Sequence, residues 1–166
     1  SAGCASGEEP YTLAILWRLR LQPAFPDLTL RIVATDHDPL LLERARAGRY
    51  EASSLKELPA DLRTAAFESC DGLSCVRPEY RVVEFLRQDL RETVPMQLLD
   101  LVLLRNVVAT YYAPDVQREI FFRVTRCMRP GGGLVLGIHE VLPDGLNALE
   151  PWPGTRAIYR RSNSCI

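Results

Sequence analysis

The 166-residue sequence lacks the features that mark several large classes of protein. No apolar run approaches the roughly 20 residues that a membrane span requires, and the first residues show no basic-then-apolar signal pattern. The net charge is -1, and acidic and basic residues are interspersed instead of gathered in one patch. A surface of that kind has no footprint for nucleic acid or an anionic membrane. We therefore expect a cytoplasmic protein with no nucleic-acid partner and no membrane insertion.

The sequence is also poor in metal-ligand patterns. Its five cysteines form no C-x-x-C pair, their number is odd, and only two histidines accompany them. A zinc site or a disulfide framework is therefore not favoured, and the expected state of the cysteines is the reduced thiol. The cysteines are Cys4, Cys70, Cys75, Cys127 and Cys165.

What the sequence does contain is the composition of an ordinary globular domain, with 47% hydrophobic and 25% charged residues. Its length suits one domain, so we expect a single domain over residues 1–166. Strand and helix patterns alternate along it, which favours an open α/β sheet of the Rossmann-like type with helices on both faces. Helices are predicted at residues 10–21, 39–47, 61–67 and 114–128, and strands at 30–35, 82–87, 98–104, 134–138 and 157–159.

Several boundaries have specific signals. Pro10 is predicted as the first residue of its helix, where its missing N–H costs no hydrogen bond. Asp38 is predicted to cap the helix that begins at Pro39, and Gly48 to end it. The run 98–104 predicts a parallel strand buried on both faces. Residues 69–76 have no clear pattern.

The chain opens with Ser1-Ala2-Gly3-Cys4-Ala5-Ser6-Gly7-Glu8-Glu9, a small-residue turn followed by two carboxylates. Glycines allow the main chain to approach a ligand closely. Adjacent carboxylates argue against a phosphate ligand, which prefers N–H groups and a lysine. A neutral or cationic ligand with hydroxyl and ammonium donors fits better. The alternative is an ordinary turn whose acids favour the positive end of a helix.

Polar residues also follow the predicted strands, where the ligands of α/β sheets bind. Asp36 is placed to accept hydrogen bonds from the hydroxyls of a ribose, or else to cap its own turn. Asp89 is placed to accept from the amine of an adenine, with Leu90 against the ring.

Arg105 and Asn106 come directly after a buried strand, where neither side chain suits the core. Arg105 is suited to a carboxylate, and Asn106 offers both a donor and an acceptor. Tyr111 and Tyr112 follow at the same predicted edge. For at least one of the two tyrosines, packing against the helix at 114–128 is the competing interpretation.

Five blocks of the sequence together resemble the CheR-type chemotaxis receptor methyltransferases. They are the opening turn through Tyr11, Ala34-Thr35-Asp36-His37-Asp38, Ala45-Arg46-Ala47-Gly48-Arg49-Tyr50, Arg105-Asn106-Val107 and Met128-Arg129-Pro130-Gly131-Gly132-Gly133. The resemblance lies in their order and spacing. It implies a methyltransferase domain that uses S-adenosylmethionine, yields S-adenosylhomocysteine and esterifies glutamate side chains on chemoreceptor cytoplasmic helices. The implied partner is a methyl-accepting chemotaxis receptor, and the implied state is a monomer.

The resemblance also implies a role for each candidate residue. Gly3 and Glu8 would contact the cofactor, Glu8 at its amino acid end, while Asp36 would bind the ribose and Asp89 with Leu90 the adenine. Arg105 and Asn106 would line the cofactor and transfer site, with Tyr111 near the sulfonium; Arg105 and Tyr111 are the predicted catalytic residues.

The sequence departs from the family pattern in several places. One extra residue precedes Tyr111, and the stretch Gly137-Ile138-His139-Glu140 lacks the usual serine. The family's N-terminal helical domain and the first strand of the sheet have no counterpart before Ser1, so we expect a truncated chain. Two alternatives remain, a methyltransferase with another acceptor and a non-catalytic cofactor-binding module.

Overall fold

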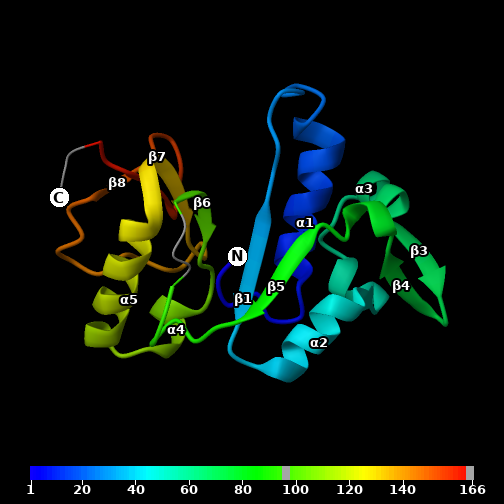
Figure 1. Cartoon of the computed structure of the whole chain (residues 1–166), viewed down its shortest axis with the longest axis horizontal. Coiled ribbons are helices and arrows are strands. Elements are labelled where there is room, and N and C mark those ends of the chain that lie inside the picture. Colours follow the sequence, from blue (N-terminus) through cyan, green and yellow to red (C-terminus); the bar gives the residue numbers. More distant parts are fainter. Residues whose placement is uncertain (95–97, 164–166) are drawn as a thin grey trace. The chain divides into compact units, whose positions relative to one another are not determined.

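The computed structural model describes residues 1–94 and 98–163, so Cys165 lies outside the described residues (Figure 1). Helices and strands alternate over part of the chain, as the sequence predicts, but among the described residues of 67–103 and 128–161 strands follow one another with no α-helix between them. The helices are α1 (Glu8–Leu16), α2 (Pro39–Ala47), α3 (Ala60–Ala66), α4 (Val108–Tyr111) and α5 (Pro114–Cys127). The strands are β1 (Ile32–Asp36), β2 (Arg49–Tyr50), β3 (Phe67–Cys70), β4 (Leu73–Val76), β5 (Val83–Arg87), β6 (Leu99–Leu103), β7 (Met128–Val135), β8 (Leu149–Pro151) and β9 (Ile158–Arg161). A π-helical turn, Trp17–Leu21, continues α1, and two short 3₁₀ helices occupy Ala52–Leu55 and Pro78–Tyr80.

The chain divides into two compact units. Unit 1 comprises Ser1 and Gly3–Arg87, and unit 2 comprises Ala2 and the chain from Gln88 onward. Each unit has its own buried core. Among the described residues, no helix is both long enough and apolar enough to cross a membrane.

Unit 1 is built on the parallel pair β1 and β5, which run in register from Ile32 opposite Val83 to Asp36 opposite Arg87. Helices α1 and α2 both pack against this pair, as Figure 1 shows for α1 beside β1. The packing is aromatic in part, because the rings of Tyr11 on α1 and Phe85 on β5 lie 5.7 Å apart. The largest buried cluster of the unit contains Tyr11, Ile15, Tyr50, Leu55, Leu62, Ala66, Phe67, Val76 and Tyr80.

The observed ends of the first two helices can be compared with the ends that the sequence predicts. For α2 the prediction is confirmed: the Asp38 carboxylate accepts from the Leu40 N–H, and Gly48, at φ 59°, ends the helix. For α1 the predicted start at Pro10 is wrong, because the helix begins at Glu8. Pro10 still lies in the first turn, where N–H groups have no helical partner, so the missing donor costs nothing there either.

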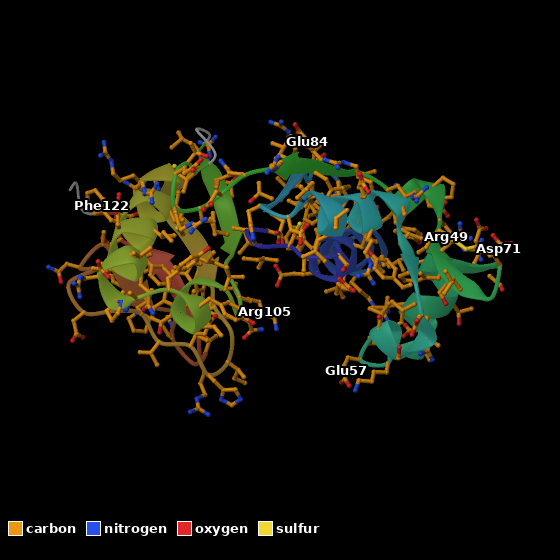
Figure 2. The ribbon with its side chains drawn as sticks, turned by 90° about the horizontal axis from the view of Figure 1, so that it is seen from below. Arg49, Glu57, Asp71, Glu84, Arg105 and Phe122 are labelled. Carbon is orange, nitrogen blue, oxygen red and sulfur yellow. A yellow bond between two sulfur atoms is a disulfide. The ribbon has the colours of Figure 1, made fainter. Side chains whose placement is uncertain are left out.

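Residues 69–76, left without a pattern by the sequence, belong to an antiparallel sheet in the order β2-β4-β3. The turn between β3 and β4 is Asp71-Gly72, with positive φ at both residues, which suits a tight hairpin. Across this hairpin Cys70 and Cys75 form a disulfide, so the expectation of reduced thiols is wrong for this pair. Figure 2 shows the disulfide near Arg49 and Asp71, whose side chains form an ion pair at 2.6 Å. A spacing of five residues reveals such a bond only when the hairpin register is known.

Unit 2 is built on a four-stranded sheet in the order β6-β7-β9-β8, with β6 parallel to β7. Helix α5 packs against this sheet through the apolar stripe that the sequence predicts. The buried core of the unit is Leu90, Val102, Leu104, Val108, Ile120, Phe121, Val124, Met128, Leu134, Leu136 and Leu149.

Two predictions about these strands are wrong. Strand β6 is not buried on both faces, since Leu101 is 43% exposed. The strand predicted at 134–138 is observed as β7, which already begins at Met128 and so includes the glycine run 131–133. A Cβ on Gly132 would lie 2.9 Å from the Arg129 carbonyl oxygen and 3.1 Å from that of Asp100. Glycine therefore lets the main chain of β7 pass close to its neighbours.

Candidate cofactor turn and acceptor segment

Four backbone N–H groups of the opening turn are bonded to acceptors within the protein. The N–H groups of Gly3 and Cys4 both donate to the Thr35 carbonyl, at 2.8 and 2.9 Å. The Ala5 N–H donates to an Asp36 carboxylate oxygen at 2.9 Å, and the Gly7 N–H to the Cys4 carbonyl at 2.9 Å. Because these four donors already have partners, the turn is not a phosphate cradle of the kind in which N–H groups point at the ligand.

Asp36 lies at the end of β1 and is 7% exposed. One carboxylate oxygen accepts from Ala5, and the other accepts from the Asp38 N–H at 3.0 Å, so Asp36 does fix its own turn. His37 Nδ1 lies 3.3 Å from that second oxygen. An ionised carboxylate has about four acceptor positions, so two backbone bonds leave capacity for a diol. The ribose contact stays a prediction.

Glu8 and Glu9 occupy the first turn of α1, where carboxylates are favoured by the helix dipole. Glu9 accepts a hydrogen bond from the Ser1 hydroxyl at 2.7 Å. With both acids beside the turn, the local charge disfavours an anionic ligand and favours one that carries ammonium or sulfonium charge. The turn and its acids therefore fit S-adenosylmethionine better than a nucleotide phosphate.

Tyr50 on β2 supports this turn from the core. Its side chain is 5% exposed, and its hydroxyl donates to the Ser6 carbonyl at 2.8 Å. Burial is the largest cause that raises the pKa of Tyr50, and the charge of Glu8 adds to it, so the hydroxyl stays a donor at neutral pH. A Cβ on Gly7 would lie 2.9 Å from the Ala45 Cβ and 3.1 Å from the Tyr50 hydroxyl. The sequence flagged this block, Ala45 to Tyr50, without giving it a role.

The two residues predicted to contact the adenine, Asp89 and Leu90, belong to unit 2 and already interact with other parts of that unit. Arg91 binds both oxygens of the Asp89 carboxylate through its Nε, at 3.0 and 3.1 Å. Leu90 is buried in the core of the unit. The adenine role of Asp89 and Leu90 stays a prediction, and an adenine amine would share the carboxylate with Arg91.

The acceptor segment, residues 105–111, follows β6 in unit 2. Arg105 lies at the surface (Figure 2). Asn106 has a left-handed backbone at φ 55°, and its N–H donates to the Glu140 carboxylate at 2.7 Å. Tyr111 ends α4 and is 77% exposed, whereas Tyr112 packs against the core. The competing interpretation, that at least one of the two tyrosines packs against the core, therefore holds for Tyr112.

The candidate residues are divided between the two units. Gly3, Glu8 and Asp36 belong to unit 1, and Asp89, Leu90, Arg105, Asn106 and Tyr111 belong to unit 2. Their convergence on one cofactor, and the role of each, stay predictions. Sequence reasoning missed Tyr50 as a support of the turn, and it named Glu140 only within the stretch Gly137-Ile138-His139-Glu140 that departs from the family pattern.

The helices, the strands and the inward-bonded turn define a class, an α/β domain whose opening turn is not a phosphate cradle. Comparison with known proteins narrows the class. Residues 1–158 match the family described as CheR methyltransferase, SAM binding domain, and the chain belongs to that family. Its cofactor is S-adenosylmethionine, as predicted, and the predicted Rossmann-like methyltransferase fold agrees with the family.

Individual relatives agree with this assignment. A chemotaxis protein methyltransferase of Listeria innocua is 34% identical over 141 residues, covering 84% of this chain and 52% of that protein. Chemotaxis protein methyltransferase 1 of Pseudomonas aeruginosa is 32% identical over 169 residues, covering 96% of this chain and 61% of that protein. An uncharacterised 104.1 kDa protein of Rhodobacter capsulatus is 37% identical over 143 residues, covering 86% of this chain and 15% of that protein. The chain thus spans about half of the two methyltransferases.

Proposed function

We propose that this chain is the catalytic domain of an S-adenosylmethionine-dependent methyltransferase that forms methyl esters on glutamate side chains of chemoreceptor cytoplasmic helices. In this proposal residues 1–166 form one domain, which acts in the cytoplasm as a monomer on a methyl-accepting chemotaxis receptor. The family match and the names of the relatives support the reaction class. The structural observation that carries the proposal is the turn, whose bonded N–H groups and adjacent acids suit a cationic cofactor.

The bound cofactor supplies an activated methyl group on a sulfonium. A glutamate carboxylate is already ionised at neutral pH, so this chain needs no general base. Its task is to align the acceptor carboxylate with the methyl group and to exclude water from it. Arg105 is suited to hold that carboxylate because its guanidinium matches carboxylate geometry. The aromatic face of Tyr111 is suited to the neighbouring positive charge.

The first test combines binding and transfer. Calorimetric titration with S-adenosylmethionine should show saturable binding. When the cofactor carries a radioactive methyl group, this group should be transferred to receptor cytoplasmic fragments as a base-labile ester. Fragments whose acceptor glutamates are replaced by alanine are the control and should take up no label. Binding without any transfer would favour a non-catalytic module, and transfer only to small molecules would contradict the receptor assignment. Failure of the full gene product to bind the cofactor would refute every enzyme hypothesis.

A second test addresses Asp36, because its carboxylate also fixes the turn. The affinity of S-adenosylhomocysteine is compared with that of its 2′-deoxy analogue in the wild type and in Asp36→Ala. If Asp36 binds the ribose, loss of the ribose 2′-hydroxyl weakens S-adenosylhomocysteine binding about tenfold or more in the wild type and far less in Asp36→Ala. This ratio of the two affinities is called the hydroxyl effect.

Asp38→Ala is the matched control for this cycle. It removes the carboxylate that caps α2 through the Leu40 N–H, two residues along the same loop. We expect it to lower the free energy of unfolding by about 1 kcal/mol and to leave the hydroxyl effect at the wild-type value. Equal hydroxyl effects in the wild type and Asp36→Ala would show that Asp36 acts only through the turn.

A further inference from the structure

Glu140 joins three separate segments of unit 2. One carboxylate oxygen accepts from the Asn106 N–H after β6 and from the Gly137 N–H after β7, each at 2.7 Å. The other oxygen accepts from the Thr110 hydroxyl in α4 at 2.9 Å. Because the acceptor is a carboxylate, these are charge-assisted bonds, which are stronger than bonds between neutral groups.

The segment that Glu140 holds has an unfavourable backbone. Asn106 has φ 55°, a left-handed conformation that asparagine tolerates at some energetic cost. Its side chain lies against Gly137, where a Cβ would overlap Asn106 Oδ1 and lie 2.9 Å from Glu140 Oε2. The missing side chain of Gly137 therefore leaves the space that both Asn106 and Glu140 occupy.

Helix α4 also depends on such a contact, because its four residues are too few for a helix to be stable by its own hydrogen bonds. The Thr110 bond ties this helix to the same carboxylate that holds Asn106. Arg105 precedes the first of these anchored residues and Tyr111 follows the second.

We propose that Glu140 is a positioning residue for methyl transfer, which orients Arg105 and Tyr111 by clamping Asn106 and Thr110 between them. The inference rests on the proposed function, because that function gives Arg105 and Tyr111 their roles. Glu140 itself contacts neither the cofactor nor the acceptor in this scheme.

Two substitutions test the role. Glu140→Ala removes all three bonds, and we expect kcat for receptor fragments at saturating cofactor to fall at least about tenfold. Glu140→Gln keeps one oxygen for the two N–H groups, and its amide can donate to the Thr110 hydroxyl. We therefore expect kcat within about threefold of the wild type. Glu150→Ala is the matched control, because Glu150 is an exposed acid of the same unit that pairs with Arg160 on β9. It should leave kcat unchanged.

Amide hydrogen exchange in the cofactor-free chain gives a readout independent of activity. Exchange at Asn106 and Gly137 should be at least about tenfold faster in Glu140→Ala, and unchanged in Glu140→Gln and Glu150→Ala. Unchanged exchange at Asn106 in Glu140→Ala would overturn the clamp. Faster exchange with unchanged kcat would make Glu140 a structural residue only and overturn its role in transfer. A wild type that transfers no methyl group would instead overturn the proposed function, while faster exchange in Glu140→Ala would still support the clamp.

Discussion

The cofactor turn in unit 1 and the acceptor segment in unit 2 are held in different ways. The turn is fixed by buried groups: its N–H donors bond to Thr35 and Asp36, and Tyr50 supports it from the core. The acceptor segment carries exposed residues such as Tyr111 and has Val108 in the core, and two of its residues, Asn106 and Thr110, bond to the Glu140 carboxylate. Changes near the turn should therefore alter stability and cofactor affinity together, whereas changes near the segment should alter transfer with little effect on stability.

The largest effect is expected from Gly7→Ala. Its φ of 89° is unfavourable for alanine, and the new Cβ would be 2.9 Å from the Ala45 Cβ. Strain of about 1–2 kcal/mol and overpacking of about 1–3 kcal/mol together should lower the free energy of unfolding by about 2–5 kcal/mol. Urea unfolding measures this change.

Gly72→Ala separates the two causes. Gly72 has a similar φ of 79°, with no atom within 4 Å of the added Cβ. It should cost only the strain, about 1–2 kcal/mol. Equal losses for the two variants would show that the contact with Ala45 is not what constrains the turn.

Tyr50→Phe is a smaller change that tests how Tyr50 supports the turn. It removes the hydrogen bond to the Ser6 carbonyl and should lower the free energy of unfolding by about 1 kcal/mol. It should also weaken S-adenosylmethionine binding, measured by calorimetry, because Ser6 lies in the turn. Tyr11→Phe is the control, since its hydroxyl donates to the Ala45 carbonyl. A similar loss of stability with unchanged affinity is expected there, and equal affinities in the two variants would contradict a specific role for Tyr50.

Gly137→Ala tests the comparison at the acceptor segment of unit 2. The added Cβ would meet the ends of two side chains, Asn106 Oδ1 and, at 2.9 Å, Glu140 Oε2. Because both ends can shift, the free energy of unfolding should fall by only about 1 kcal/mol or less. Methyl transfer should nevertheless fall, because the acceptor segment moves with Asn106. Gly145→Ala, at φ 90° with no atom within 4 Å, should show the reverse, a stability loss of about 1–2 kcal/mol with normal transfer. Parallel losses of stability and transfer in both variants would erase the distinction between the two regions.

The smallest effect concerns Cys4, a buried residue of the turn itself. The pKa of its thiol is raised to about 12, first by burial and then by the charge of Asp36. Alkylation by iodoacetamide at about pH 8.5 should be at least tenfold slower at Cys4 than at the less buried Cys127, as read by mass spectrometry. Comparable rates would mean that the turn opens readily.

The same raised pKa fixes the sign of a pH effect. The unfolded thiol ionises near pH 9 and the folded one near pH 12, so the folded state keeps its proton longer. This contribution to the free energy of unfolding is complete below about pH 9 and is lost as the pH rises toward about 12. Cys4→Ala should lack that part of the alkaline loss in urea titrations at a series of pH values.

Sequence reasoning reached the features that depend on neighbouring residues. The cap at Asp38, the end of α2 at Gly48 and the stripe of α5 each follow from side chains within one or two helical turns. The family was also reached, because the order of five blocks carries more information than any one of them.

What the sequence by itself determined is therefore the family, the cofactor and most of the helices and strands. The tertiary structure decided how the turn and the segment are held, since Tyr50 bonds to Ser6 across 44 positions and Glu140 to Asn106 across 34. It also decided the Cys70–Cys75 bond, which follows from the register of β3 against β4. Such contacts depend on how strands pair and cores pack, and no spacing within one segment specifies either.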